Sequence, residues 1–208
     1  EIKNRIMVSG HATMFSFMGM PTERYIDYYG ARAKGGAGLI VMEAVAVSPH
    51  SALFGDLWPV HGWKDEIIPM MKKISAEVHS NGGKIFCQAW HNGNENTSMV
   101  SGLHTQSCSA VPSAGIGEVP AEMSVSEIRE TIRMYAAFAM RLKESNFDGI
   151  ELHFAHGYLP QQFISPLYNL RNDQYGGSLE NRMGFGLELI DTVRKAVGKD
   201  FVVGLRIS

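Results

Sequence analysis

The regular alternation of strand-like and helix-like segments is the feature that most constrains how this chain of 208 residues can fold. Five short apolar runs are typical of strands buried on both faces. They lie at residues 5–9, 37–47, 84–90, 149–154 and 201–207. Four segments with the helical spacing of apolar residues separate them, at 22–34, 64–80, 124–142 and 178–197. Strands that alternate with helices in this way predict a parallel sheet with right-handed crossovers.

End signals support three of the helices. Ser124 is followed three residues later by Glu127, the spacing of a capping box at a helix start. The helices that end near residues 34 and 80 are followed by Gly35-Gly36 and by Asn81-Gly82-Gly83, which are typical helix stops.

Five strands fit either an open doubly wound sheet or part of a closed barrel, which takes about 250 residues. The Gly-x-Gly-x-x-Gly turn of a dinucleotide-binding open sheet does not follow the first run, where the chain reads Val8-Ser9-Gly10-His11-Ala12. We therefore predict an α/β fold, a TIM (β/α)8 barrel present as an incomplete N-terminal portion of about five β/α units. Residues 1–208 would be part of a single domain whose remaining strands lie beyond the chain.

Composition excludes some partner classes. The 19 basic and 21 acidic residues nearly balance, so neither a nucleic-acid footprint nor a polyacid tail is indicated. No run approaches ~20 apolar residues, and the first residues lack the apolar core of a signal peptide. Cys87 and Cys108 are too few for a disulfide framework. We expect a cytoplasmic protein that acts on a small molecule, without nucleic acid or membrane, and leave homo-oligomerisation open.

Two irregular stretches follow strands, at residues 14–21 and 91–123. Loops longer than about 12–15 residues in a compact domain are usually functional or mobile. The longer stretch is either a lid over an active site or a solvated excursion, and its Gly, Ser and Pro content fits both.

Polar side chains gather where the predicted strands end. In a parallel barrel these ends share one mouth, where active sites are built. A primary amide, several imidazoles, a phenol and a guanidinium would meet there. The residues concerned are Gly10-His11-Ala12, Glu43-Ala44, Gln88 with Trp90-His91, His153 with His156 and Tyr158, and Arg206.

Each of these residues also has a purely structural interpretation. A histidine beside a strand often only caps loop backbone, and Tyr158 alone is more often a buried phenol. Arg206 fits equally well as the ion-pair partner of a carboxylate not identified from the sequence. Three further polar residues are predicted to bind the Gly176-Gly177 loop through local ion pairs: Arg171, Asp173 and Arg182.

A long pattern in the second half of the chain resembles a known family. It runs from Gln162-Phe163-Ile164-Ser165-Pro166 through Arg171, Asp173 and Tyr175-Gly176-Gly177-Ser178 to Asn181-Arg182. Two other segments share the resemblance: Lys3-Asn4-Arg5-Ile6 near the start of the chain, and residues 153–159. The chain is similar over its whole length to the old yellow enzyme family of NADH:flavin oxidoreductases, including the larger branch with dienoyl-CoA reductase and trimethylamine dehydrogenase. That family folds as an eight-stranded barrel that binds FMN.

The resemblance implies a role for each residue at the mouth. FMN would contact Gly10, His11, Ala12 and Ala44, mainly through main chain. Gln88 would hydrogen-bond the pyrimidine edge of the ring, and Arg206 would lie near N1 and the C2 carbonyl. His153 and His156 would bind the substrate carbonyl oxygen, and Tyr158 would donate a proton. An iron–sulfur cluster and FAD are expected only in a C-terminal region outside these residues.

The implied activity is reduction of the C=C bond of an α,β-unsaturated carbonyl with hydride taken from NAD(P)H. A His–His pair favours this reaction, because amine dehydrogenases of the family tend to carry tyrosine at the position of His153. However, His11 and the run 159–163 look like the amine-oxidising branch, so oxidative demethylation of a small methylated amine stays an alternative. Ala12 stands where many relatives carry a cysteine or threonine that touches the flavin.

A metal-dependent barrel hydrolase is the alternative from another class. His11, His91, His153 and His156 could supply ligands. Ligating carboxylates are missing at these strand ends apart from Glu43, and the charge of Arg206 would repel a cation. We therefore predict no metal site.

Overall fold

The computed structural model describes residues 1–53 and 58–208. All five predicted strands form, within two residues of their predicted ends, and they make one parallel sheet in the order β1-β2-β3-β6-β7. The strands are β1 (Met7–Val8), β2 (Leu39–Ala46), β3 (Lys84–Trp90), β6 (Gly149–Phe154) and β7 (Val202–Ile207). Because strands that follow one another in the chain are neighbours in the sheet, every connection is a simple crossover.

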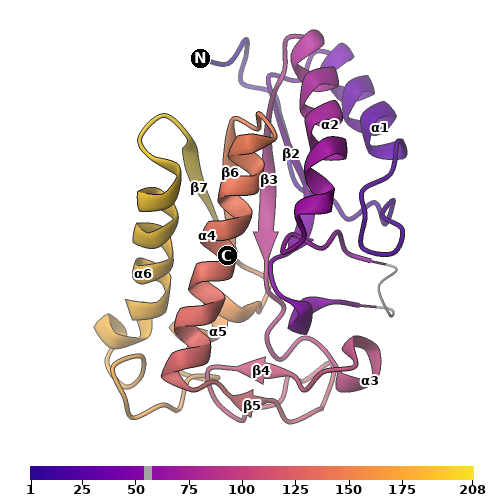
Figure 1. Ribbon diagram of the computed structural model, residues 1–208. Coiled ribbons are helices and arrows are strands. Elements are labelled where there is room, and N and C mark those ends of the chain that lie inside the picture. The colour runs from indigo at the N-terminus through magenta and orange to yellow at the C-terminus, as the bar shows by residue number, and fades with distance from the viewer. Residues whose placement is uncertain (54–57) are drawn as a thin grey trace.

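Four long helices form a layer in front of this sheet in Figure 1. They are α1 (Arg24–Lys34), α2 (Ile68–Ser80), α4 (Val125–Glu144) and α6 (Leu179–Val197). Each packs on the next, α1 on α2, α2 on α4 and α4 on α6. The core lies between helices and sheet, and its largest fully buried side chains include Tyr25, Tyr29, Met71, Ile74, Tyr135 and Phe185. Burial of these faces against the sheet is the main favourable contribution to folding.

The helix ends confirm the predicted signals. Ser124 Oγ accepts from the Glu127 N–H at 3.3 Å, and the Glu127 carboxylate accepts from the Ser124 N–H at 2.7 Å, which is the predicted capping box. Ser178 caps α6 in the same way through the Asn181 N–H. Helix α2 begins later than predicted, because residues Asp65–Ile67 form a separate 3-10 turn, η2.

Several small elements were not predicted. They are η1 (Pro49–Ser51), α3 (Ser98–Ser101), β4 (Gln106–Ser107), β5 (Ala121–Glu122) and α5 (Leu159–Ile164). Segments this short do not show a periodic pattern. The small β4–β5 sheet and α3 lie at the end of the molecule to which the arrow of β3 points, the carboxyl end of the main sheet (Figure 1).

The 91–123 segment is bound to the chain that follows β6. The fully buried Gln162 of α5 accepts from the Asn94 N–H at 3.2 Å and from Ser107 Oγ at 2.8 Å. Its amide nitrogen donates to the carbonyls of Asn92 at 3.0 Å and Gly157 at 2.6 Å. The solvated-excursion interpretation does not describe the middle part of this segment, because residues 105–109 are buried. The lid interpretation stays a prediction.

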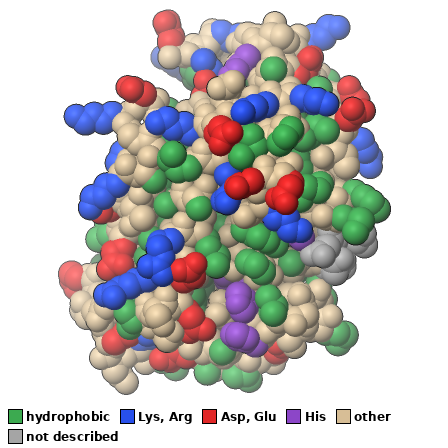
Figure 2. Space-filling model, in the orientation of Figure 1, with side chains coloured by type: hydrophobic (Ala, Val, Ile, Leu, Met, Phe, Trp, Pro, Cys, Tyr) green, Lys and Arg blue, Asp and Glu red, His purple; other side chains and the backbone are tan. Residues whose placement is uncertain are grey.

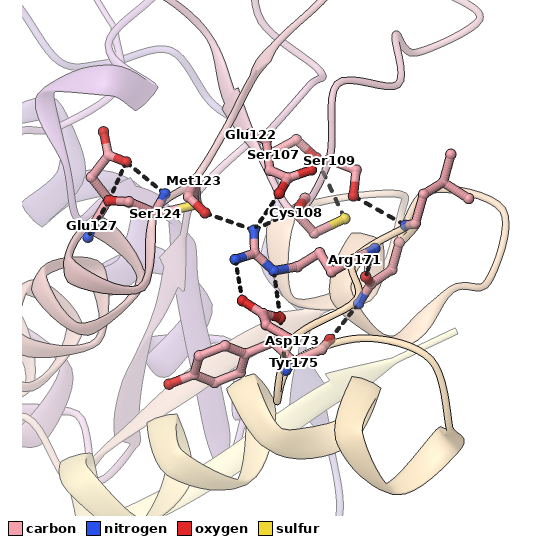
Figure 3. Close-up of polar contacts among 12 residues, drawn as sticks. Ser107, Cys108, Ser109, Glu122, Met123, Ser124, Glu127, Arg171, Asp173 and Tyr175 are labelled. Carbon is pink, nitrogen blue, oxygen red and sulfur yellow. Dashed lines mark hydrogen bonds and ion pairs between the residues drawn. The ribbon is translucent and has the colours of Figure 1, made fainter.

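A second tie is the Arg171 clamp, shown in Figure 3. Arg171 Nη1 donates to the carbonyls of Cys108 at 2.9 Å and Met123 at 2.6 Å. Its Nε and Nη2 bind the Asp173 carboxylate at 3.0 and 2.5 Å. Arg182 Nε donates to the Ile164 carbonyl at 2.8 Å. These contacts agree with the structural role predicted for the three polar residues.

The surface seen in Figure 2 carries basic and acidic side chains interspersed over the helices. This mixture agrees with the near-balanced charge of the sequence. Within residues 1–53 and 58–208, the helices fall short of the length and apolar character that a membrane span requires.

Candidate functional site

A cavity of about 270 Å³ brings together every residue for which the family resemblance implied a cofactor-binding, substrate-binding or proton-donating role. It lies at the carboxyl ends of the strands, as the barrel prediction requires. The predicted residues that line it are Gly10, His11, Ala12, Ala44, Gln88, His153, His156, Tyr158 and Arg206. Trp90, which was also predicted at the mouth, lines the cavity too, and Ser9 and Trp58 complete the lining.

Strand register explains why these residues meet. Ala44 of β2 is the partner of Gln88 in β3, Gln88 is the partner of Glu151 in β6, and Glu151 is the partner of Gly204 in β7. The four positions form one row across the sheet. Two residues further toward the carboxyl end of these strands, His153 is the partner of Arg206. Because side chains two apart in a strand share a face, Glu151 and His153 point to the same side of the sheet.

A register shift in β2 places Ala44 in this row. Met42 pairs with Cys87 and Ala44 pairs with Gln88, so Glu43 is the extra residue of a β-bulge. The bulge lets Met42 join the core with Cys87 while Ala44 faces the cavity with Gln88. Glu43 itself is fully buried and does not line the cavity, contrary to its predicted place at the mouth.

Glu43 instead holds two walls of the site. Its carboxylate accepts hydrogen bonds from the Thr13 N–H, in the loop after β1, and from the Tyr25 hydroxyl. It also accepts from Trp58 Nε1 at 3.2 Å. Burial, and then the charge of Glu43, raises the pKa of Tyr25, so this phenol remains a donor. The loop after β1 and the Trp58 ring are therefore fixed by one buried carboxylate.

His153 is a neutral hydrogen-bond donor at the cavity. Its side chain is buried, and its Nδ1 accepts from the Ala155 N–H at 3.3 Å. Burial lowers the pKa of His153 to about 4, with further lowering from His156 and Arg206. At neutral pH the ring is therefore uncharged, and because Nδ1 is an acceptor, the proton is assigned to Nε2.

His156 and Tyr158 stand beside this ring. The His156 ring centroid is 4.9 Å from that of His153, and the Tyr158 centroid is also 4.9 Å from that of His153. His156 is exposed and adopts a left-handed backbone conformation, φ 60°. Burial, and then the charge of Glu95, raises the pKa of Tyr158, so its hydroxyl is protonated at neutral pH. Three groups that can donate hydrogen bonds thus surround one end of the cavity.

Gln88 and Arg206 are joined by a carboxylate that the sequence analysis missed. Gln88 Nε2 donates to Glu151 Oε1 at 2.8 Å, and Arg206 binds both Glu151 oxygens at 3.2 Å. The ion-pair interpretation of Arg206 is therefore correct, and Arg206 lines the cavity as well. An acidic residue inside an otherwise apolar strand, two positions before His153, was the available signal.

His91 does not belong to the site, contrary to its predicted place at the mouth. Its side chain is fully buried, its Nδ1 accepts from the Gly93 N–H at 3.1 Å, and burial lowers its pKa to about 3. Within the described parts of the chain, the structure contains no group of three or more His, Cys, Asp or Glu side chains arranged to hold a metal ion. The metal-hydrolase alternative therefore lacks a ligand set there.

The remaining donor set suits a flat heterocycle with adjacent carbonyl and N–H groups. The Gln88 amide offers both a donor and an acceptor, and Arg206 offers a fixed cation. Glycine at position 10 keeps the space beside this amide free. A Cβ built at Gly10 would lie 3.4 Å from the Gln88 amide atoms and would occupy that space. The residues present therefore fit a planar cofactor of this chemistry.

Comparison with known proteins agrees with the geometry. Residues 1–208 match the profile of the NADH:flavin oxidoreductase / NADH oxidase family. The chain is 41% identical over 210 residues to an NADH oxidase from Thermoanaerobacter brockii, covering 100% of this chain and 32% of that protein. It is 38% identical over 222 residues to an N,N-dimethylglycine/sarcosine dehydrogenase from Chromohalobacter salexigens, covering 99% of this chain and 30% of that protein.

Solved structures confirm the predicted fold class. Morphinone reductase superposes with a TM-score of 0.92 at 30% identity, covering 99% of this chain and 58% of that one. Old yellow enzymes are among the other solved structures that match. The five-stranded sheet corresponds to part of the barrel in these proteins. The chain spans about a third of the length of the two curated relatives.

Proposed function

Because the chain belongs to the NADH:flavin oxidoreductase / NADH oxidase family, as its resemblance to the old yellow enzymes predicted, we propose that it forms the active-site half of an ene-reductase. The enzyme would take hydride from NAD(P)H and reduce the C=C bond of an α,β-unsaturated carbonyl. The observation that carries this proposal is one cavity lined by Gln88 and Arg206 together with His153, His156 and Tyr158.

FMN is the cofactor that we propose for the cavity. Gly10, His11, Ala12 and Ala44 would contact it, Gln88 would bind its N–H and carbonyl edge, and Arg206 would supply positive charge. When bound, FMN supplies the hydride that the protein itself cannot carry. A fixed cation beside it favours the anionic reduced form over the oxidised form.

The substrate carbonyl would be held by the two imidazoles. In our proposal His153 donates through Nε2–H, which its neutral state and its Nδ1 contact support. His156 would donate to the same oxygen, where negative charge grows during hydride addition. Loss of one such donor costs about 2.7–4 kcal/mol of barrier in comparable oxyanion sites. Tyr158, whose hydroxyl is protonated at neutral pH, would then protonate the α-carbon.

Oxidative demethylation of a small methylated amine is a second candidate. The rings of Trp58 and Trp90 both line the cavity, with centroids 5.7 Å apart, and Trp90 lies 5.3 Å from Tyr158. Aromatic faces of this kind attract alkylammonium groups. One relative is named a dehydrogenase of N,N-dimethylglycine and sarcosine. The His–His pair favours the enone reaction over this one.

Anaerobic spectroscopy tests the proposal. The protein that carries this chain should bind FMN, bleach on addition of NADH or NADPH, and regain its colour with 2-cyclohexenone. His156→Ala should leave bleaching by NAD(P)H unchanged but slow recovery by about 10²-fold. His104→Ala is the matched control, because His104 is exposed and outside the cavity.

Two outcomes contradict this assignment. A colourless protein that takes up no added FMN excludes the flavin reaction. Recovery of colour by the His156→Ala protein at the wild-type rate excludes the proposed role of His156. Bleaching by N,N-dimethylglycine without NAD(P)H would instead favour the amine reaction.

A further inference from the structure

We propose that Glu151 is a positioning residue for the cofactor end of the cavity, fixing the orientation of the Gln88 amide and moderating the charge of Arg206. This inference rests on the proposed function, since it concerns the two residues assigned to FMN. Glu151 does not line the cavity, whereas both of its partners do. It therefore acts through them.

The position of Glu151 follows from the sheet. It is the register partner of Gln88 on one side and of Gly204 on the other. Gly204 has no side chain, and the nearest heavy atom to a Cβ built there would be the Ile150 carbonyl oxygen at 3.7 Å. The space beside Glu151 is thus open, and Arg206, two residues after Gly204, reaches back to it.

The first consequence concerns the Gln88 amide. An ionised carboxylate only accepts hydrogen bonds, so the Gln88 group that faces Glu151 at 2.8 Å has to be the NH₂. The amide oxygen is then left for the cavity, where it can accept from a ring N–H. Without Glu151, the amide would be free to rotate by 180° and present the wrong group for part of the time.

The second consequence concerns charge. The Arg206 side chain is 29% exposed, and its Nε and Nη2 are both directed to Glu151, whose side chain is 10% exposed. The pair is side-on and partly desolvated, so the carboxylate offsets much of the positive potential that Arg206 creates in the cavity. Arg206 alone would favour an anionic reduced cofactor more strongly than the pair does.

Two substitutions separate these effects. Glu151→Gln removes the charge while keeping the size of the side chain, and we expect the ratio of affinities for reduced and oxidised FMN to rise about tenfold. For a two-electron couple, that change raises the midpoint potential by about 30 mV. Glu151→Asp keeps the charge but withdraws the carboxylate by one methylene, so the potential should stay near the wild-type value. The dissociation constant of the Glu151→Asp protein for oxidised FMN should rise about tenfold.

The measurements are FMN fluorescence quenching for affinity and spectroelectrochemistry for potential, on the protein that carries this chain. Glu144→Gln is the matched control, because it neutralises an exposed carboxylate at the end of α4 that pairs with Lys72 of α2. The FMN affinity and the midpoint potential of Glu144→Gln should equal those of the wild type. Circular dichroism checks that each variant folds, and if Glu151→Gln does not fold, Glu151→Asp decides.

The outcomes are distinguishable. A wild-type protein that binds no FMN overturns both the proposed function and this inference. If the wild type binds FMN and the Glu151 variants match its affinity and potential, the inference alone is wrong. A potential that falls in Glu151→Gln also overturns it, because loss of a negative charge beside Arg206 cannot disfavour the anionic form.

Discussion

Replacement of Arg171 by methionine should destabilise the protein by about 2–6 kcal/mol, because two buried carbonyls lose their donor. The substitution keeps the apolar stem but removes the donors to the Cys108 and Met123 carbonyls. The Arg171 side chain is 4% exposed, and Cys108 and Met123 are 0% and 1% exposed, so water cannot replace the lost bonds freely. Each unsatisfied buried group costs about 1–3 kcal/mol, so the two carbonyls together give about 2–6 kcal/mol.

Urea unfolding at pH 7 measures this loss as a shift in midpoint with unchanged slope. The control is Arg133→Met, the same substitution in an exposed pair with Glu130 on α4, where a loss of about 0–1 kcal/mol is expected. If the two variants differ by less than 1 kcal/mol, the clamp does not stabilise the fold as described.

The pH dependence of stability is a second check on the contact between Arg171 and Asp173. The hydrogen bonds from Arg171 lower the pKa of Asp173 in the folded protein. A lowered folded pKa stabilises the fold above the unfolded value of about 3.9, and this contribution is lost as pH falls through the folded pKa. The difference in stability between wild type and Arg171→Met should therefore narrow below about pH 4. A difference that widens on acidification would refute the assignment.

Two further predictions follow from the site and its supports. His153 should remain neutral, with its proton on Nε2, from pH 6 to 9 in ¹⁵N NMR spectra, because its pKa is lowered to about 4; a midpoint near 6.5 would contradict this. Gly93→Ala should cost more than 3 kcal/mol in urea unfolding, since its φ is 62° and a Cβ would lie 2.0 Å from the Gln162 amide oxygen. Gly102→Ala, with φ 72° and open space around it, should cost only about 1 kcal/mol; equal losses would show that the Gln162 contact is not what excludes a side chain.

The sequence predicted the main sheet because its strands are buried on both faces and therefore appear as continuous apolar runs. It also predicted the cavity residues, because the carboxyl ends of parallel strands meet at one edge. The same reasoning misplaced His91 and Glu43. In a regular strand Met42 and Ala44 would share one face, but the bulge at Glu43 puts them on different faces. The periodic pattern of apolar residues does not indicate such a bulge.

Other parts of the site depend on contacts between distant residues. Trp58 reaches the cavity beside Glu43, and the Arg171 clamp binds carbonyls 48 and 63 residues away in the chain. Such bonds cannot be inferred from local spacing. Glu151 was missed for a different reason, since it was counted as part of an apolar run although its charge requires a buried partner.

The ties made by Gln162 and Arg171 have a consequence for how this architecture can diversify. They hold the 91–123 segment at residues 92–94, 107–108 and 123, while the mostly exposed stretches 98–103 and 114–117 lie between these anchors. Insertions or deletions in the two stretches would change the rim at the carboxyl end of the sheet without disturbing a single anchoring bond. Related chains are thus free to reshape this rim at little thermodynamic cost while the residues that line the cavity stay the same.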